Sequence, residues 1–420
     1  MTARTPWANA PRLLERIEQL GSVGATPDGG VCRIALSDAD REGRDLVRRW
    51  MREIGLEVLV DQIGNIFGRY PVGDDSPAVM VGSHIDTVAT GGKYDGNLGV
   101  LAGLELAQTL IERKIEMSRP IVVAIFTNEE GVRYSPDMMG SLVFAGGLSL
   151  DAALGAAGID GTRLGSELER IGYRGTLPIG AIPVHAYVEL HIEQGPVLEA
   201  EGTVIGAVEM VQGISWTECT IQGQSNHAGT TPMRLRRDAG WATCNIADFV
   251  HRLAGEMGGT QVGTVGRISL TPNLINVVAR QAVFTVDLRN TDDAELAEAE
   301  RRFDTYARDL TRKGGMTFES KRLVRLPPVK FDEGIVTLVE KAAVAAGYSV
   351  KRMPSGAGHD AQMLAARCPA GMIFVPSVGG ISHNVREFTK PEDIEAGLSV
   401  LERVVMTLCT EGGMRDARSA

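Results

Sequence analysis

The chain is poor in cysteine. It has five in 420 residues, an odd and scattered set without a Cys-x-x-Cys spacing, so neither a disulfide framework nor a thiolate zinc site is indicated. We expect them to be buried apolar fillers, at Cys32, Cys219, Cys244, Cys368 and Cys409. The first residues lead into a charged amphipathic segment and not into an apolar signal core, so we expect a cytoplasmic protein.

Long apolar runs and a basic excess are also missing. No apolar run approaches the roughly 18 residues that span a bilayer, so no membrane partner is expected. The formal net charge of −10 leaves no excess of Lys and Arg to neutralise phosphates, which argues against nucleic-acid binding. Composition says nothing positive about the ligand.

The length predicts two domains, because 420 residues exceed what one core usually holds. Residues 1–212 and 329–420 alternate strands with helices, which indicates an α/β sheet covered by helices. Residues 213–328 follow the order β-α-β-β-α-β of a ferredoxin-like sandwich. We therefore expect the second domain to be inserted into the first.

Hydrophobic periodicity predicts the elements of both domains. Helices are expected at 38–54, 98–110, 238–257, 293–312, 333–346 and 391–410. Strands are expected within 57–70, up to His84, and at 121–126, 215–222, 262–269, 282–289, 316–322 and 372–375.

The motif GSHIDTV contains the most informative residues. It follows the apolar run 78–81, which looks like a buried strand, so His84 and Asp86 point to the same side. A metal-bound histidine usually donates its second ring N–H to a carboxylate, which is the role we expect for Asp86. Asp95 follows in GGKYDG, a glycine-rich loop that can bend close to a metal. The fragment fits half of a metal site, and it fits a capped strand end with a Gly-Gly turn equally well.

Other histidines and carboxylates follow strand-like runs. If the strand 121–126 stays extended, Glu129 and Glu130 point to opposite sides, so that one can bind metal while the other moves protons. His191 lies in ELHIEQGP and His383 in GGISHN. A lone histidine is more often structural than a ligand, but a cluster of His, Asp and Glu fits two metal ions bridged by a carboxylate. Zinc is the default, and cobalt, manganese or nickel can substitute.

A colinear series of motifs carries a family resemblance: GSHIDTV, GGKYDG, TNEEGVRY, ELHIEQGP, NHAGTTPM, NLINVV, DLR, SGAGHDA and ISHN. The chain resembles the bimetal amidohydrolases that include the N-carbamoyl-L-amino acid hydrolases, allantoate amidohydrolases and β-ureidopropionases, within the zinc aminopeptidase and aminoacylase superfamily. The resemblance implies a zinc-aminopeptidase-like catalytic domain with Glu129 as general base. It implies two metal ions held by His84, Asp95, Glu130, His191 and His383, with Asp95 bridging.

The resemblance also marks residues that hold the substrate: Gln194, His227, Asn276, Arg289 and Gly358. A guanidinium such as that of Arg289 offers the bidentate fork that a carboxylate prefers, although an interdomain ion pair is an alternative role for it. In the family the histidine matching His227 comes from the partner subunit. That implies a homodimer built through an inserted lid and dimerisation domain, with His227 stabilising the oxyanion.

The implied reaction is hydrolysis of the carbamoyl C–N bond of an N-carbamoyl-L-amino acid, which releases an amino acid, ammonia and carbon dioxide. Allantoate, N-carbamoyl-β-alanine or another acylamino acid are alternative substrates, because each presents a carboxylate and a similar amide. An aminoacylase or dipeptidase, or a metal-binding protein without catalysis, is a further alternative. Retention of Glu129 argues against the last, since a binding module has no use for a positioned base.

Overall fold

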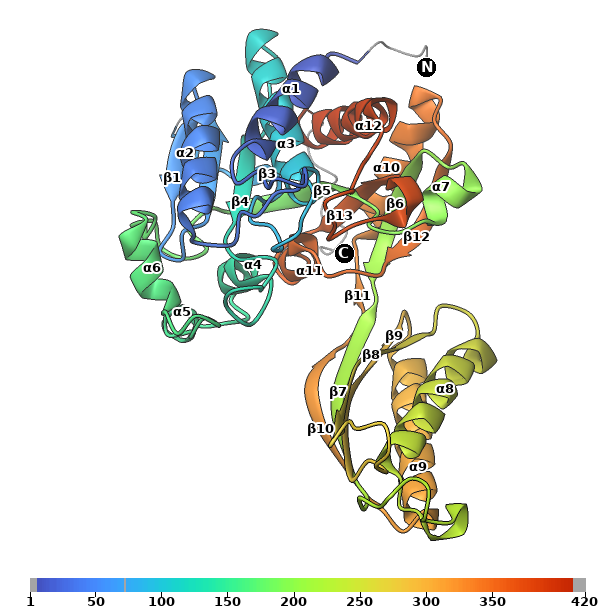
Figure 1. Ribbon diagram of the computed structural model, residues 1–420. Helices are drawn as coiled ribbons and strands as arrows, with labels where there is room; N and C mark the ends of the chain where they lie inside the picture. Colours follow the sequence, from blue (N-terminus) through green and yellow to red (C-terminus); the bar gives the residue numbers. More distant parts are fainter. Residues whose placement is uncertain (1–5, 72, 411–420) are drawn as a thin grey trace, which may run out of the picture. The chain divides into compact units, whose positions relative to one another are not determined.

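A computed structural model describes residues 6–71 and 73–410 of the chain. It divides into two compact units (Figure 1). Unit 1 comprises Met1–Glu209 with Lys330–Ala420, and unit 2 comprises Met210–Val329. These limits lie within three residues of the expected borders at 212/213 and 328/329.

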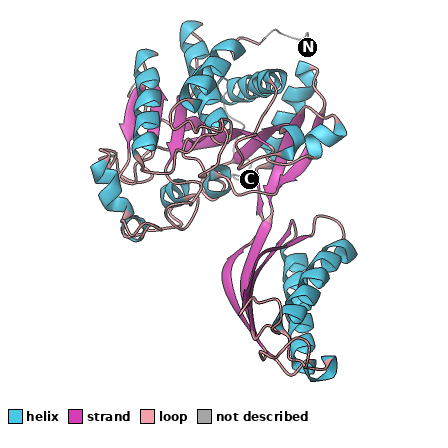
Figure 2. Cartoon of the chain, viewed as in Figure 1, coloured by secondary structure: helices cyan, strands magenta, loops and turns pink. Residues whose placement is uncertain are grey.

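Unit 1 is built on a nine-stranded mixed sheet (Figure 2). The order across the sheet is β1 (Glu57–Val60), β2 (Ile66–Tyr70), β4 (Ile121–Phe126), β3 (Ala78–His84), β5 (Val184–Ile192), β13 (Ala370–Val375), β6 (Ile205–Val211) and β11 (Val329–Lys330), with β12 (Val350–Ser355) beside β6. Strand β3 runs parallel to β4 and β5, and β13 runs parallel to β5, whereas β1 pairs antiparallel with β2, β2 with β4, and β6 with β13.

Helices cover both faces of this sheet (Figure 1). Helix α3 packs on β3, β4 and β5 and is buried along almost its whole length, which is why its sequence is apolar nearly all round. Helix α12 packs on β13 and β5, and α11 packs on β13 and α4. The helices of unit 1 are α1 (Ala10–Gly21), α2 (Asp38–Glu53), α3 (Asn97–Glu112), α4 (Met139–Ala145), α5 (Leu150–Leu154), α6 (Leu164–Arg170), α7 (Val197–Glu201), α10 (Glu333–Ala346), α11 (Asp360–Leu364) and α12 (Pro391–Thr410), with the 3-10 turn η2 (Val378–Gly380).

Unit 2 has the ferredoxin-like order that the sequence predicts. Its four-stranded antiparallel sheet has the order β10-β7-β9-β8. Strand β9 alternates buried and half-buried residues, and its buried face packs with both helices around Phe284, Ile246 and Phe303. The elements are β7 (Gly213–Gln222), η1 (Met233–Leu235), α8 (Ala239–Met257), β8 (Val262–Thr271), β9 (Gln281–Asn290), α9 (Asp293–Lys313) and β10 (Thr317–Leu326).

Most long elements lie where periodicity predicts them, and one expectation, that all five cysteines are buried, needs correction. The short elements β6, β11, β12, α4 to α7 and α11 carry too few residues to show a period. All five thiols are free, but Cys244 is exposed and Cys32 half-buried, so these two are not core fillers. Within the described residues, no helix has the length and apolarity that crossing a bilayer requires.

A buried ion pair joins α2 to the sheet. Arg44 Nε lies 2.8 Å from Asp40 Oδ2, and both side chains are fully buried. The other Arg44 nitrogens donate to Gly64 O at 2.8 Å and to Thr127 Oγ1 at 3.3 Å, beside the end of β4. Asp40 Oδ2 also accepts from Leu36 N. The pair therefore holds the segments of Leu36, Gly64 and Thr127 to α2 by hydrogen bonds.

We predict that Asp40→Asn lowers the free energy of unfolding by about 3–5 kcal/mol, because it leaves the Arg44 charge buried without its counter-ion. Urea denaturation measures this loss. The matched control is Glu53→Gln, since Glu53 and Arg49 form an exposed pair on the same helix. Equal effects of the two substitutions contradict the prediction.

Candidate active site

Three parallel strands end at one edge of the unit 1 sheet and place the candidate residues there. His84 is the last residue of β3, and His191 is the next to last of β5. Glu129 and Glu130 follow β4, which ends at Phe126. The carboxyl ends of neighbouring parallel strands meet at one edge, the usual position of ligand sites in α/β sheets. Chain segments far apart in sequence therefore converge.

Asp95 approaches this edge on the loop before α3. Its Oδ1 lies 3.2 Å from His191 Nε2 and 3.6 Å from His84 Nε2. The next residue, Gly96, has φ +65°, and a Cβ built on it lies 2.5 Å from the His84 ring. Only glycine allows this approach of backbone to imidazole. His84, Asp95 and His191 form one buried cluster of possible metal ligands.

The second oxygen of Asp95 faces another pair of donors. Asp95 Oδ2 lies 3.5 Å from His383 Nε2, which is 3.4 Å from Glu130 Oε2. Asp95, Glu130 and His383 thus form a second cluster that shares Asp95 with the first. His383 is 52% exposed at the side chain, against 7% for Asp95. The second cluster is therefore the side of the site open to solvent.

The donor set fits metal ions of the size of zinc. Two ligands about 2.0–2.1 Å from a tetrahedral ion lie about 3.3 Å from each other, and the separations here are 3.2–3.6 Å. The Nδ1 atoms of His84 and His191 each lie 2.9 Å from a backbone carbonyl, of Asp86 and Ile192. Since a carbonyl cannot donate, Nδ1 carries a proton, and Nε2 is the atom that faces Asp95 and can bind a metal when it is deprotonated.

Burial and neighbouring charges shift the pKa values of these groups. Burial opposes ionisation of Asp95, but hydrogen bonds from three imidazoles hold its pKa well below the usual range. Burial and the charge of Asp95 raise the pKa of Glu130 to about 8. The hydrogen bond to Asp95 raises the pKa of His383 to about 9. A site so rich in buried carboxylates attracts cations.

Glu129 and Glu130 reach the site through a turn. The strand does not stay extended, because Asn128 has φ +55° and its side chain donates to Tyr134 O at 2.9 Å. The carboxylates still separate as the sequence suggests. Glu129 Oε2 lies 3.4 Å from His84 Nε2, on the side of the first cluster, while Glu130 belongs to the second.

Asp86 lies at the site, but its carboxylate does not play the expected part. It is 4.0 Å from His84 Nδ1, whereas the backbone carbonyl of Asp86 is at 2.9 Å. The carboxylate accepts instead from the backbone N–H groups of Glu129 and Glu130, each at 3.3 Å. β3 ends at His84, so the alternation of a strand does not extend to Asp86. The carbonyl orients the ring, and the carboxylate holds the turn after β4.

Two expected substrate residues lie in unit 1. Gln194 Nε2 donates to Asp95 Oδ2 at 2.7 Å, while Gln194 Oε1 is buried without a hydrogen-bond partner. A buried, unpaired acceptor beside the ligand cluster is free to take a substrate N–H. Gly358 precedes His359, whose ring lies 4.6 Å from that of His191. A Cβ at Gly358 comes within 2.8 Å of the side chain of Met138.

The other three expected substrate residues belong to unit 2. His227 and Asn276 are neighbours, since Ala228 N donates to Asn276 O at 2.9 Å. His227 Nδ1 accepts from Gly229 N and Thr230 N, so the neutral ring carries its proton on Nε2. Arg289 on β9 forms an ion pair at 2.8 Å with Asp287 of the same strand. That partner is within unit 2, unlike the interdomain partner considered as an alternative.

Sequence reasoning missed two residues that hold the Asp95 loop. Glu387 Oε1 accepts from the backbone N–H groups of Tyr94 and Asp95, each at 3.1 Å. Ser382 Oγ lies 3.2 Å from Asp95 Oδ2 and 3.0 Å from Glu387 Oε2, so its one hydrogen can be donated to either carboxylate. Only their closeness to His383 in the sequence offered a signal. Their partners are almost 300 residues away in the chain.

A further cluster of possible ligands combines Glu189, His191 and His359. Its members are already engaged. Glu189 accepts from Ser83 Oγ at 2.6 Å and Ala361 N at 2.9 Å, and His359 Nε2 lies 2.8 Å from Ser355 Oγ. We interpret it as a support behind His191.

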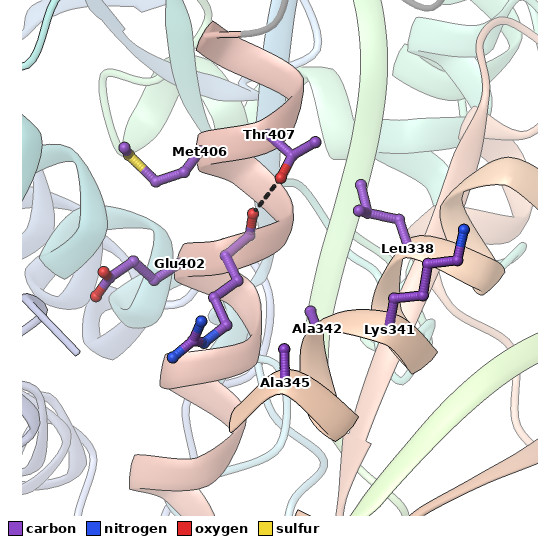
Figure 3. A pocket seen from close by; sticks show the side chains of 8 residues that line it. Leu338, Lys341, Ala342, Ala345, Glu402, Met406 and Thr407 are labelled. Carbon is purple, nitrogen blue, oxygen red and sulfur yellow. Dashed lines mark hydrogen bonds between the residues drawn. The ribbon is translucent and has the colours of Figure 1, made fainter. Parts of the chain in front are cut away.

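A separate pocket lies between α10 and α12 (Figure 3). Leu338, Ala342 and Met406 contribute its apolar surface, and Lys341 stands at its side. Its one carboxylate, Glu402, accepts from the backbone N–H groups of Trp7 and Ala8. The pocket holds none of the candidate ligands.

Comparisons with known proteins show the family of the chain. The model of Peptidase family M20/M25/M40 matches residues 80–407. An N-carbamoyl-L-amino-acid amidohydrolase of Rhizobium meliloti is 42% identical, covering 95% of this chain and 96% of that protein. An allantoate amidohydrolase of Bacillus subtilis is 33% identical, covering 94% and 97%.

A solved structure extends the agreement to the fold. It is an amidase of the hydantoinase/carbamoylase family from Burkholderia multivorans, with a TM-score of 0.91 and 44% identity, covering 95% of this chain and 98% of that one. The resemblance and the fold class predicted from the motifs are confirmed. The chain therefore belongs to Peptidase family M20/M25/M40 and is a hydrolytic enzyme.

Proposed function

We propose that the protein hydrolyses the carbamoyl C–N bond of N-carbamoyl-L-amino acids, releasing the amino acid, ammonia and carbon dioxide. The observation that carries the proposal is Asp95, whose two oxygens serve two donor clusters while the Glu129 carboxylate lies beside one of them. The relatives named N-carbamoyl-L-amino-acid amidohydrolase support the substrate class. The allantoate amidohydrolase relative makes allantoate the second candidate substrate.

We propose that two divalent ions, zinc by preference, occupy the clusters. His84, Asp95 and His191 would hold one, and Asp95, Glu130 and His383 the other. Manganese, cobalt or nickel suits the same nitrogen and oxygen donors. When bound, such ions polarise a carbonyl oxygen and make water nucleophilic near neutral pH.

Glu129 is the proposed general base. It would take the proton of the attacking water and deliver it to the leaving nitrogen. Burial and the carboxylates of Asp360 and Glu130 raise its pKa well above the usual value, against the opposing charge of His84. A raised pKa makes Glu129 a stronger proton acceptor than a surface carboxylate. Asp86 supports the role by holding the backbone N–H of Glu129.

Residues from both units would hold the substrate. Gln194 Oε1 is available to a ureido N–H, and Asn276 and Gly358 would line the amide. Arg289 would bind the carboxylate of the amino acid through its fork. His227 has Nε2–H as a donor for the oxyanion that develops on the carbamoyl oxygen.

A homodimer through unit 2 would bring His227 to the site of the partner subunit. Strand β8 supports this proposal, because it is an edge of the unit 2 sheet and carries exposed Val262 and Ile268. Leu274 and Ile275, just after β8, are also exposed. Unpaired strand edges with apolar side chains are typical pairing surfaces.

We also propose a cytoplasmic location, which fits the five free thiols.

A substrate assay tests the proposal. We expect the zinc-, manganese- or cobalt-loaded protein to release ammonia fastest from N-carbamoyl-L-amino acids, more slowly or not at all from allantoate and N-carbamoyl-β-alanine, and not after chelation. Preference for allantoate would select the second candidate. Activity only on N-acetyl amino acids or dipeptides, measured by amine release, would overturn the proposed reaction, as would silence on every substrate.

Glu129→Gln should lower kcat by about 10²–10⁴-fold or more, because the amide cannot accept the proton. Metal content, measured by atomic emission, should stay at the wild-type value, since Glu129 is not among the proposed ligands. Glu130→Gln is the matched control, and it should lower metal content together with activity. Near-normal turnover of Glu129→Gln would remove the base from the mechanism.

If His227 acts in the site of the partner subunit, two inactive variants should complement each other in a mixed dimer. Glu129→Gln and His227→Ala chains should each be inactive alone. Mixed by co-expression, they should regain about a quarter of wild-type activity, because half of the dimers are mixed and one site in each is complete. The chain carrying both substitutions is the control and should stay inactive. If His227 acts within its own subunit, the mixture has no complete site and no activity returns.

A further inference from the structure

Arg33 is a fully buried cation whose hydrogen bonds go to neutral oxygens. Its Nε donates to Ile85 O at 2.7 Å, and one terminal nitrogen donates to Leu20 O and Val23 O, both at 2.8 Å. The other terminal nitrogen donates to Asn97 Oδ1 at 2.8 Å. Burying a charge is costly, and an apolar side chain could fill the same space. The hydrogen bonds of the guanidinium therefore explain why a charged side chain occupies this buried position.

Two of these bonds reach the turns that carry the metal-ligand candidates. Ile85 is the residue between His84 and Asp86, so the bond to its carbonyl fixes the turn after β3. That turn places the Asp86 carbonyl against His84 Nδ1 and the Asp86 carboxylate against the backbone of Glu129. Thr87, which ends the turn, exchanges two hydrogen bonds with the Arg33 backbone.

Asn97 connects Arg33 to the Asp95 loop, as Ile85 connects it to the turn after β3. Its backbone N–H donates to Asp95 O at 2.6 Å, and its side chain donates to Lys93 O at 3.3 Å. Holding Asn97 Oδ1 therefore fixes the loop on both sides of Asp95. The separation of His84 Nε2 from Asp95 Oδ1, 3.6 Å, depends on the relative position of the two turns that Arg33 joins.

The remaining bonds anchor the guanidinium. Leu20 O lies in the last turn of α1, where backbone carbonyls carry partial negative charge that stabilises a cation, and Val23 O lies two residues beyond the end of the helix. Helix α2 makes room for the side chain at Gly43, where a Cβ would lie 2.8 Å from Arg33 Cδ. Three nitrogens in a planar fork reach three directions at once, which the single nitrogen of lysine cannot do.

We propose that Arg33 is a positioning residue of the metal centre, which sets the affinity of the His84, Asp95 and His191 cluster for its ion by clamping the His84 turn to the Asp95 loop. The inference rests on the proposed metal centre. It concerns metal binding itself, so it can be tested without turnover.

The test titrates Co²⁺ into the metal-stripped full-length protein and follows the visible absorption of bound cobalt. Arg33→Met and Arg33→Lys should both weaken binding by about 10–100-fold, the usual effect of losing a partner that orients ligands. Asn97→Ala should weaken binding in the same direction, because it removes one end of the clamp. Thermal unfolding checks that each variant is folded.

Arg16→Met is the matched control. Arg16 is also buried on α1, but it bonds to Gln108 of α3 at 2.6 Å, away from the ligand turns. It should lose stability and keep the wild-type affinity for Co²⁺. Wild-type affinity in folded Arg33→Met and Arg33→Lys, or in Asn97→Ala if those two do not fold, would overturn the inference. Failure of the wild-type protein to bind Co²⁺ would overturn the metal centre, and with it the proposed function.

Discussion

The sharing of Asp95 between two donor clusters is the constraint on which the rest of the site depends. One oxygen faces His84 and His191, and the other faces His383. A carboxylate can serve both sides only if its loop is fixed to within about 0.5 Å of the productive geometry. The backbone conformation at Gly96 and the hydrogen bonds of Glu387 to Tyr94 N and Asp95 N meet this need. The main chain holds the loop, so the position of the loop does not depend on the carboxylate alone.

The second consequence of this arrangement is electrostatic. Asp95, Glu129 and Glu130 are brought together at one sheet edge, where each carboxylate raises the cost of ionising the next. The imidazoles offset part of this cost, and the proposed metal ions would offset the rest. A site with these groups would be poorly stable without metal.

The sequence was a good guide to elements and to residue types. Six apolar residues in a row predict β4, and the β-α-β-β-α-β order of unit 2 follows from its periodicity alone. Motifs named the residues that the structure gathers, His84, Asp95 and His191 among them. Their roles as ligands and base are proposals that this geometry supports, whereas the proposed part of unit 2 in catalysis rests on the family resemblance.

What the sequence determined was local. Short segments of sequence fix three properties: the period of the apolar residues, the glycine in the Asp95 loop, and the presence of imidazoles and carboxylates at the site. The tertiary structure decided which groups hydrogen-bond to one another. Asp86 gives its carbonyl to His84 and its carboxylate to a turn more than 40 residues away. Glu387 holds a backbone N–H 292 residues away, and Arg33 joins three segments. No local pattern encodes these contacts, because only the packing of α1, α2 and the sheet brings their donors and acceptors within hydrogen-bond distance.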